Sequence, residues 1–116
     1  MPKPGQIVVF AFPQTNLLNT KLRPALLIQR LPGKYDDWLT CMISSKTNQA
    51  IPGFDDIINE VDNDYANSGL KTSSVFRVGR LAVQEQNIFL GSIGEISDSR
   101  LQRISENISS WIYPKT

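Results

Sequence analysis

The sequence contains no histidine and only one cysteine in 116 residues. Histidine is the side chain that most often serves as a general base near neutral pH and as a metal ligand. A zinc site takes its ligands mainly from cysteine and histidine, so this composition argues against one. Catalysis would have to use arginine, lysine, carboxylates, hydroxyls or backbone groups, and we expect no metal or other cofactor.

Long apolar runs are also missing. The longest, Ile7–Phe12 and Ala25–Ile28, are far too short to span a bilayer. The first residues, MPKPG, lack the apolar stretch of a secretory signal. The lone Cys41 cannot form an internal disulfide, and its place in the alternating run DDWLTCMIS predicts a small core residue. These features predict a cytoplasmic protein without membrane association.

The chain also lacks a strong overall charge, because its formal net charge is only +1. Its distribution is uneven: residues 51–70 carry five acidic side chains and no basic one. Residues 1–50 are net +4 and residues 71–116 net +2. Two basic regions around an acidic segment could form a local anion-binding face, or simply a mixed solvated surface. Charge alone leaves both interpretations open.

The length is enough for one domain, covering residues 1–116. Apolar runs bounded by glycine, proline and polar clusters predict a series of short strands. In the third, Trp38, Thr40, Met42 and Ser44 should share one face. We expect strands within residues 3–13, 23–31, 35–45, 56–59, 71–83 and 89–97.

The tail is the clearest helix. Its apolar residues Leu101, Ile104, Ile108, Trp111 and Ile112 recur at helical spacing, and Ser97 is a suitable N-cap. A helical turn ending at Gly69 is also expected. Several short strands and one C-terminal helix predict a small, strongly bent antiparallel sheet or barrel. A dimer would help to cover the first strand, which is apolar on both faces.

Arg23 precedes Pro24 and the apolar run ALLI, so a buried strand would hold it rigidly. Its forked guanidinium suits a phosphate better than a lysine does. The alternative is a structural ion pair or a solvated strand end. Spacing alone does not decide between these interpretations.

Ser44 and Ser45 end the third strand and are followed by Lys46. Hydroxyls there could hydrogen-bond a phosphate or a transition-state oxygen, or could simply form a turn. Arg77 and Arg80 lie on either side of Gly79, and they could follow a nucleic-acid backbone without reading bases.

The order of these segments resembles the MazF/PemK toxins of type II toxin–antitoxin systems. The resemblance rests on KPGQIVVFAFP, KLRPALLIQ, ISS at the end of the next strand, SGLKTSSVFRV and LGSIGEIS before an amphipathic helix. It covers nearly the whole chain. The family implies an SH3-like β-barrel of the CcdB/MazF type with a C-terminal helix, acting as a homodimer and blocked by a cognate antitoxin.

The resemblance also implies an activity: metal-independent, sequence-specific cleavage of single-stranded RNA, usually mRNA. The family's catalytic arginine falls on Arg23, and its partner hydroxyl, usually threonine, falls on Ser44. In the implied mechanism, the RNA 2′-hydroxyl attacks the adjacent phosphate. Arg23 would stabilise charge on the phosphoryl oxygens, and Ser44 would hydrogen-bond the phosphate or the leaving oxygen.

Further residues become candidates for RNA binding through the same resemblance. The segment QTNLLNTKL would grip substrate, and Glu85 takes the place of an aspartate found in some members. The RNA-binding candidates are Gln14, Thr15, Lys21, Ser45, Lys46, Arg77, Arg80 and Glu85.

Two departures from the family pattern keep other functions open. Serine at position 44 keeps the hydroxyl but loses the stiffness of a β-branched side chain. Val83 stands where some members have threonine, and it can neither donate nor accept a hydrogen bond. A CcdB-like toxin that binds DNA gyrase without cleaving RNA, or a catalytically weakened RNA-binding relative, would also fit this pattern.

Overall fold

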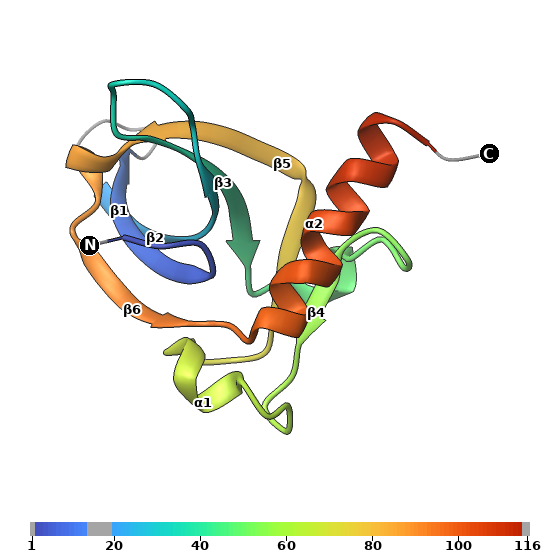
Figure 1. Cartoon of the computed structure of the whole chain (residues 1–116). Helices are drawn as coiled ribbons and strands as arrows, with labels where there is room; N and C mark the ends of the chain where they lie inside the picture. Colours follow the sequence, from blue (N-terminus) through green and yellow to red (C-terminus); the bar gives the residue numbers. More distant parts are fainter. Residues whose placement is uncertain (1, 14–19, 115–116) are drawn as a thin grey trace.

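The computed structural model describes residues 2–13 and 20–114. Its centre is one antiparallel sheet of six strands, in the spatial order β4-β5-β3-β2-β1-β6. The sheet curls into a half-barrel, and the long C-terminal helix lies against its β4–β5 side (Figure 1). The strands are β1 (Gln6–Pro13), β2 (Thr20–Arg30), β3 (Asp37–Ser44), β4 (Asp56–Ile58), β5 (Ser74–Glu85) and β6 (Gly91–Glu95).

Each strand lies within or overlaps a segment predicted from the sequence. The helices are α1 (Tyr65–Ser68) and α2 (Asp98–Ile112), with short 3₁₀ turns η1 (Thr47–Gln49) and η2 (Gln86–Ile88). The Ser97 side chain caps α2 by accepting a hydrogen bond from the backbone N–H of Arg100. Gly69 ends α1 with φ +73°, a conformation that favours glycine. The predicted sheet and C-terminal helix are therefore confirmed.

The main core lies on the face of the sheet that meets α2. Alternate strand residues, including Leu26, Ile43 and Phe76, pack there with Ile104 and Ile108 of the helix. The C-terminal end of α2 is less buried. There Trp111 contacts Phe54 edge to face, and Ile112 is exposed. Cys41 is fully buried in this core, as expected.

The opposite face of the sheet has a smaller cluster of Val8, Leu27 and Trp38, with Phe89 packed against it. Trp38 and Cys41 thus face opposite sides, as the alternation in the third strand predicts. Val8 and Phe10 are both only 3% exposed within this single chain. The expectation that a partner would cover the second face of the first strand therefore does not hold for these residues.

β5 bends sharply where its pairing with β3 is interrupted (Figure 1). Cys41 pairs with Leu81, whereas the next residue, Met42, pairs with Arg77. Residues 78–80 of β5 consequently have no partner in β3 and form a bulge. Gly79 lies within this bulge, a place where glycine in a strand is common. The bulge strengthens the curl of the sheet at the strand end that carries Arg77.

Candidate functional site

Arg23 lies in β2, the strand that pairs with β1 on one side and with β3 on the other. Its backbone pairs with Phe10 of β1, and Pro24 pairs with Val9. The following residues Ala25–Ile28 are buried, so the strand that carries Arg23 is fixed in the core. The Arg23 side chain itself is half-buried. The backbone at Arg23 is therefore held in the sheet, as the sequence predicted.

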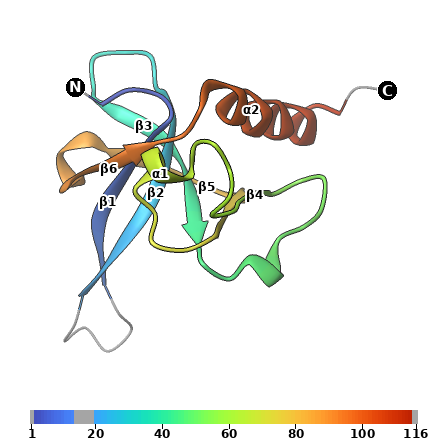
Figure 2. The same ribbon diagram turned by 90° about the horizontal axis from the view of Figure 1, so that it is seen from below.

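Arg23 and Ser44 each lie two residues beyond the last pair of β2 and β3, which is Ala25 with Met42. Residues two apart in a strand point to the same face, so both side chains lie on the face away from α2. The hydrogen-bonded pairing ends at Ala25, and the two strands diverge beyond it (Figure 2).

The Ser44 hydroxyl is oriented by the turn that follows it. Its oxygen accepts a hydrogen bond from the Lys46 backbone N–H at 3.1 Å. With that lone pair occupied, the hydroxyl proton can be donated to a substrate oxygen. Ser45 and Lys46 are exposed just past the strand end. The hydroxyl of Ser44 and the cationic side chain of Lys46 thus come from neighbouring positions at this end of β3.

Arg77 joins the same face from the other side of Ser44. Ser44 pairs with Val75 and Met42 with Arg77, so Arg77 is a diagonal cross-strand neighbour of Ser44. Its Nε lies 3.4 Å from Asp55 Oδ2, and its Nη1 donates to Gln49 Oε1 at 3.4 Å. The sequence analysis missed Asp55 and Gln49, because only the folded loop brings them to β5.

The other predicted RNA-binding residues fall at different distances from this strand end. Lys21 is exposed, two residues before Arg23 on the same face of β2. Arg80 is exposed in the β5 bulge. Glu85 pairs with Asp37, at the end of β3 opposite to Ser44, roughly 23 Å along the strand at about 3.3 Å per residue. Gln14 and Thr15 lie outside the described residues.

Val83 and Glu85, which replace a threonine and an aspartate of some family members, both lie far from Ser44 within the chain. Val83 pairs with Leu39, near the same far end of β3 as Glu85. Neither residue lies beside Arg23 or Ser44 in one copy of the chain. The loss of a polar group at position 83 therefore leaves the Arg23–Ser44 arrangement unchanged.

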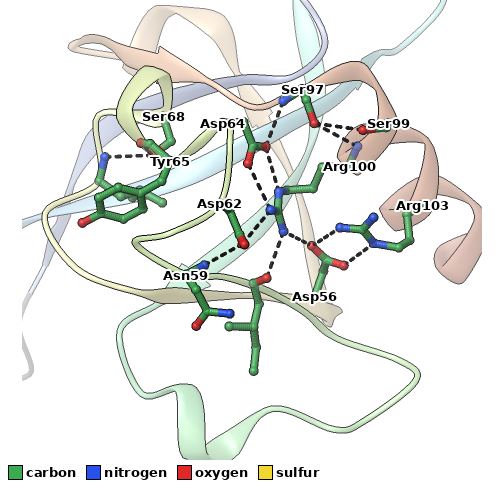
Figure 3. Close-up of polar contacts among 12 residues, drawn as sticks. Asp56, Asn59, Asp62, Asp64, Tyr65, Ser68, Ser97, Ser99, Arg100 and Arg103 are labelled. Atoms are coloured by element: carbon green, nitrogen blue, oxygen red, sulfur yellow. Dashed lines mark hydrogen bonds and ion pairs between the residues drawn. The ribbon is translucent and has the colours of Figure 1, made fainter.

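The acidic segment forms a separate polar network around Arg100 of α2 (Figure 3). The Arg100 guanidinium donates to Asp56 at 2.6 Å, to Asp62 at 3.0 Å and to Asp64 at 2.8 and 3.0 Å. It also donates to the Ile57 carbonyl at 2.9 Å. Four of the five carboxylates in residues 51–70 pair with arginines, namely Asp55, Asp56, Asp62 and Asp64, whereas Glu60 is exposed.

Arginine pairing sets the protonation of this network. The hydrogen bond from Arg100 lowers the pKa of Asp64 to about 2, although burial acts in the opposite direction. Burial would lower the pKa of Arg100, but its hydrogen bonds to Asp64 and Asp56 outweigh burial and raise the pKa. Asp64 and Arg100 are therefore both charged at neutral pH. The network attaches the start of α2 to the β4–α1 segment, and we assign it a structural role.

Two other features of the described residues do not suit phosphate binding. Burial raises the pKa of the Cys41 thiol to about 12, so it stays protonated at neutral pH. A surface hollow at the far end of β3 is lined by Tyr35, Asp36, Asp37, Glu85, Gln86 and Asn87. Its carboxylates would repel a phosphate.

Within residues 2–13 and 20–114, no group of three or more His, Cys, Asp or Glu side chains is placed to hold a metal ion. Within the same residues, no helix has both the length and the apolar character needed to cross a membrane.

Comparison with known proteins gives a consistent result. The toxin MazF-mt6 of Mycobacterium tuberculosis has a similar fold, with a TM-score of 0.62 and 16% sequence identity. The alignment covers 94% of this chain and 99% of the toxin. Comparison with curated proteins gives no significant match. A family model described as "PemK-like, MazF-like toxin of type II toxin-antitoxin system" matches residues 3–112. The chain therefore belongs to the PemK-like, MazF-like toxins of type II toxin–antitoxin systems.

Proposed function

We propose that this toxin is an endoribonuclease that cleaves single-stranded RNA, with mRNA as its target, at specific sequences and without a metal ion. The observation that carries the proposal is that Arg23 and Ser44 both lie two residues beyond the last β2–β3 pair, Ala25 with Met42, on one face of the sheet. A cation and a hydroxyl are the two groups that the family's chemistry requires, and both keep a competent functional group in this chain.

The proposed reaction is an internal transesterification. The RNA 2′-oxygen loses its proton and forms a bond to the adjacent phosphorus, while the bond from phosphorus to the 5′-oxygen breaks. The leaving oxygen gains a proton, so the products carry a 2′,3′-cyclic phosphate and a 5′-hydroxyl. Arg23 stabilises the charge on the phosphoryl oxygens, because negative charge grows there in the transition state. A guanidinium is a poor general base, so Arg23 is not assigned as the proton acceptor.

Ser44 acts as a hydrogen-bond donor to the phosphate or to the leaving oxygen. The hydrogen bond from Lys46 to its oxygen supports this role, because it leaves the hydroxyl proton available for the substrate. A preorganised contact of this type is worth about 3–4 kcal/mol of barrier. The exposed side chains of Lys21, Lys46 and Arg80 would bind flanking phosphates, and their charge makes that binding dependent on salt.

The partners proposed are the RNA substrate, a cognate antitoxin protein and a second copy of the chain, all in the cytoplasm. In a homodimer, residues remote from Arg23 in one copy, such as Glu85, can reach RNA held by the other copy. A strictly monomeric mass at micromolar concentration would count against the homodimer.

The test is to incubate the protein with a long single-stranded RNA in EDTA and to compare wild type with Arg23→Ala and Ser44→Ala. We expect cleavage by the wild type and a loss of about 100-fold or more in rate for Arg23→Ala. Arg30→Ala is a matched control, because it removes a partly exposed arginine from the other end of β2.

Four outcomes would contradict parts of this proposal. Cleavage that disappears in EDTA would exclude the metal-free mechanism. Wild-type rates in Arg23→Ala would remove Arg23 from the site. RNA that is bound but never cut would favour a catalytically weakened relative, and the absence of both binding and cleavage would favour a toxin that acts on another target, such as DNA gyrase.

A further inference from the structure

The least exposed carboxylate near the proposed site is that of Asp55, whose side chain is 1% exposed. Asp55 lies in the loop between η1 and β4, and none of the proposed catalytic steps uses it. Its Oδ1 accepts the Val78 backbone N–H at 2.8 Å, and its Oδ2 accepts the Ile51 N–H at 3.0 Å. The Arg77 Nε lies 3.4 Å from the same Oδ2.

The β5 bulge explains why a carboxylate is needed here. Val78 is the first residue of the bulge, so its N–H has no partner in β3. A buried N–H without a partner is costly, and Asp55 supplies the acceptor. The carboxylate that completes the bulge therefore also determines where the neighbouring guanidinium of Arg77 lies.

Two nitrogens of the Arg77 guanidinium have partners that orient the side chain. Nε faces Asp55, and Nη1 donates to Gln49 Oε1 at 3.4 Å. Among the described residues, nothing accepts a hydrogen bond from Nη2. An arginine presents its donors in a rigid fork, so fixing Nε and Nη1 also fixes the direction of Nη2.

The positions of Arg23 and Arg77 suggest a path for the RNA. The two arginines lie on opposite sides of Ser44, in β2 and β5, and all three side chains share the face away from α2. A backbone that crosses the strands from β2 to β5 would place the scissile phosphate at Arg23 and Ser44. The neighbouring phosphate would then reach Arg77.

We infer that Asp55 is a positioning residue which, with Gln49, aligns Arg77 to bind the phosphate next to the scissile one. This inference rests on the proposed ribonuclease function. The competing account is that Arg77 serves only as the counter-ion of a buried carboxylate. The two accounts predict opposite changes in RNA binding when Asp55 loses its charge.

The first measurement is the affinity for a 2′-O-methyl RNA, which lacks the attacking hydroxyl, at several salt concentrations. Arg77→Met should weaken binding about tenfold, the effect expected of one lost charge-assisted hydrogen bond. It should also reduce the slope of log affinity against log salt by about 0.7, the value for one phosphate of a single strand. Arg30→Met removes the same charge from an exposed ion pair and should change the affinity less than threefold.

The second measurement addresses Asp55 directly. If Asp55 positions Arg77, then Asp55→Asn weakens binding, and the double variant with Arg77→Met binds like Arg77→Met alone. If Arg77 is only a counter-ion, Asp55→Asn releases a positive charge, and RNA binds more tightly with a steeper salt slope. Asp36→Asn is the charge-matched control at the opposite end of β3.

Gln49→Leu keeps the test valid if Asp55→Asn does not fold. Gln49 is exposed and its side chain accepts a hydrogen bond from Arg77, so its loss should leave folding intact while weakening binding about threefold. In cleavage assays, Gln49→Leu and Arg77→Met should raise KM and change kcat less than threefold, because the neighbouring phosphate is not the reacting one.

The outcomes separate this inference from the proposed function. If wild type neither binds nor cleaves RNA, the proposed function fails, and this inference fails with it. If wild type binds RNA and Arg77→Met does so equally well, this inference alone is overturned. Tighter binding by Asp55→Asn would also overturn it.

Discussion

Replacement of Arg100 by methionine is the most direct perturbation of the structural network. The substitution keeps a long unbranched side chain but removes the cation from three carboxylates. The Arg100 side chain is 7% exposed, and those of Asp56 and Asp64 are 9% and 8% exposed. Removing one partner of a buried ion pair costs about 3–5 kcal/mol, because the remaining charge stays buried. Arg103 still lies 2.7 Å from Asp56, so we expect the lower end of this range.

Urea unfolding followed by circular dichroism measures this cost. A domain is typically stable by about 5–15 kcal/mol, so Arg100→Met should lose a large part of the total. With a slope of about 1–3 kcal/mol per molar urea, the midpoint should fall by about 1 M or more. The control is Arg30→Met, which breaks the solvent-accessible pair with Asp36 and two hydrogen bonds to the Leu31 and Tyr35 carbonyls, and it should cost clearly less than Arg100→Met. A loss below about 1 kcal/mol for Arg100→Met would refute the structural role.

Three further predictions concern stability. The pKa of Asp64 is about 2 in the folded state, below its ordinary value. The stability that its charge contributes is therefore complete above about pH 4 and is lost as pH falls toward 2. Asp64→Asn should reduce this acid-dependent loss of stability by the order of 2 kcal/mol, measured by unfolding at several pH values. A Cβ at Gly69 would lie 2.0 Å from the Ile93 carbonyl oxygen, whereas one at Gly53 meets nothing within 4 Å. Both have positive φ, so Gly69→Ala should lower the free energy of unfolding by about 1–3 kcal/mol more than Gly53→Ala, and equal losses would contradict the described packing. Ser97→Ala should cost about 0.5–2 kcal/mol through the lost cap of α2, measured by thermal unfolding.

The pattern of strands and the C-terminal helix could be predicted because local sequence decides them. Alternation in DDWLTCMIS and the helical spacing from Leu101 to Ile112 each report one buried face. The bulge in β5 was less visible. Gly79 within an otherwise continuous strand was its only local signal, and the unpaired Val78 N–H appears only once β3 is in register.

The role of the acidic segment could also have been anticipated in part. Arg100, Ile104 and Ile108 follow one another at intervals of four, so Arg100 lies on the apolar stripe of α2. A cation on a buried stripe requires carboxylates, and residues 55–64 contain the nearest surplus of them. Tertiary structure decides which carboxylates pair with Arg100, and no local pattern predicts that they are Asp56, Asp62 and Asp64. The same holds for Asp55, which binds at β5 instead.

For the candidate site, the sequence supplied the residue types and the fold supplied their arrangement. Arg23 and Ser44 are 21 positions apart, and the β2–β3 register places both just beyond the last pair of the two strands. Whether they perform the proposed chemistry stays a prediction. The same holds for Lys21, Ser45, Lys46, Arg77, Arg80 and Glu85, and for Gln14 and Thr15 beyond the described residues.

The chemistry of the cut ends tests the central proposal most directly. A long single-stranded RNA is incubated with the protein in EDTA, and the new 5′ ends are examined for labelling by a polynucleotide kinase without prior phosphatase treatment. Attack by the 2′-hydroxyl leaves a 5′-hydroxyl, so the account predicts immediate labelling and a 2′,3′-cyclic phosphate on the other fragment. Fragments with 5′-phosphate ends, or RNA that stays intact, would contradict it.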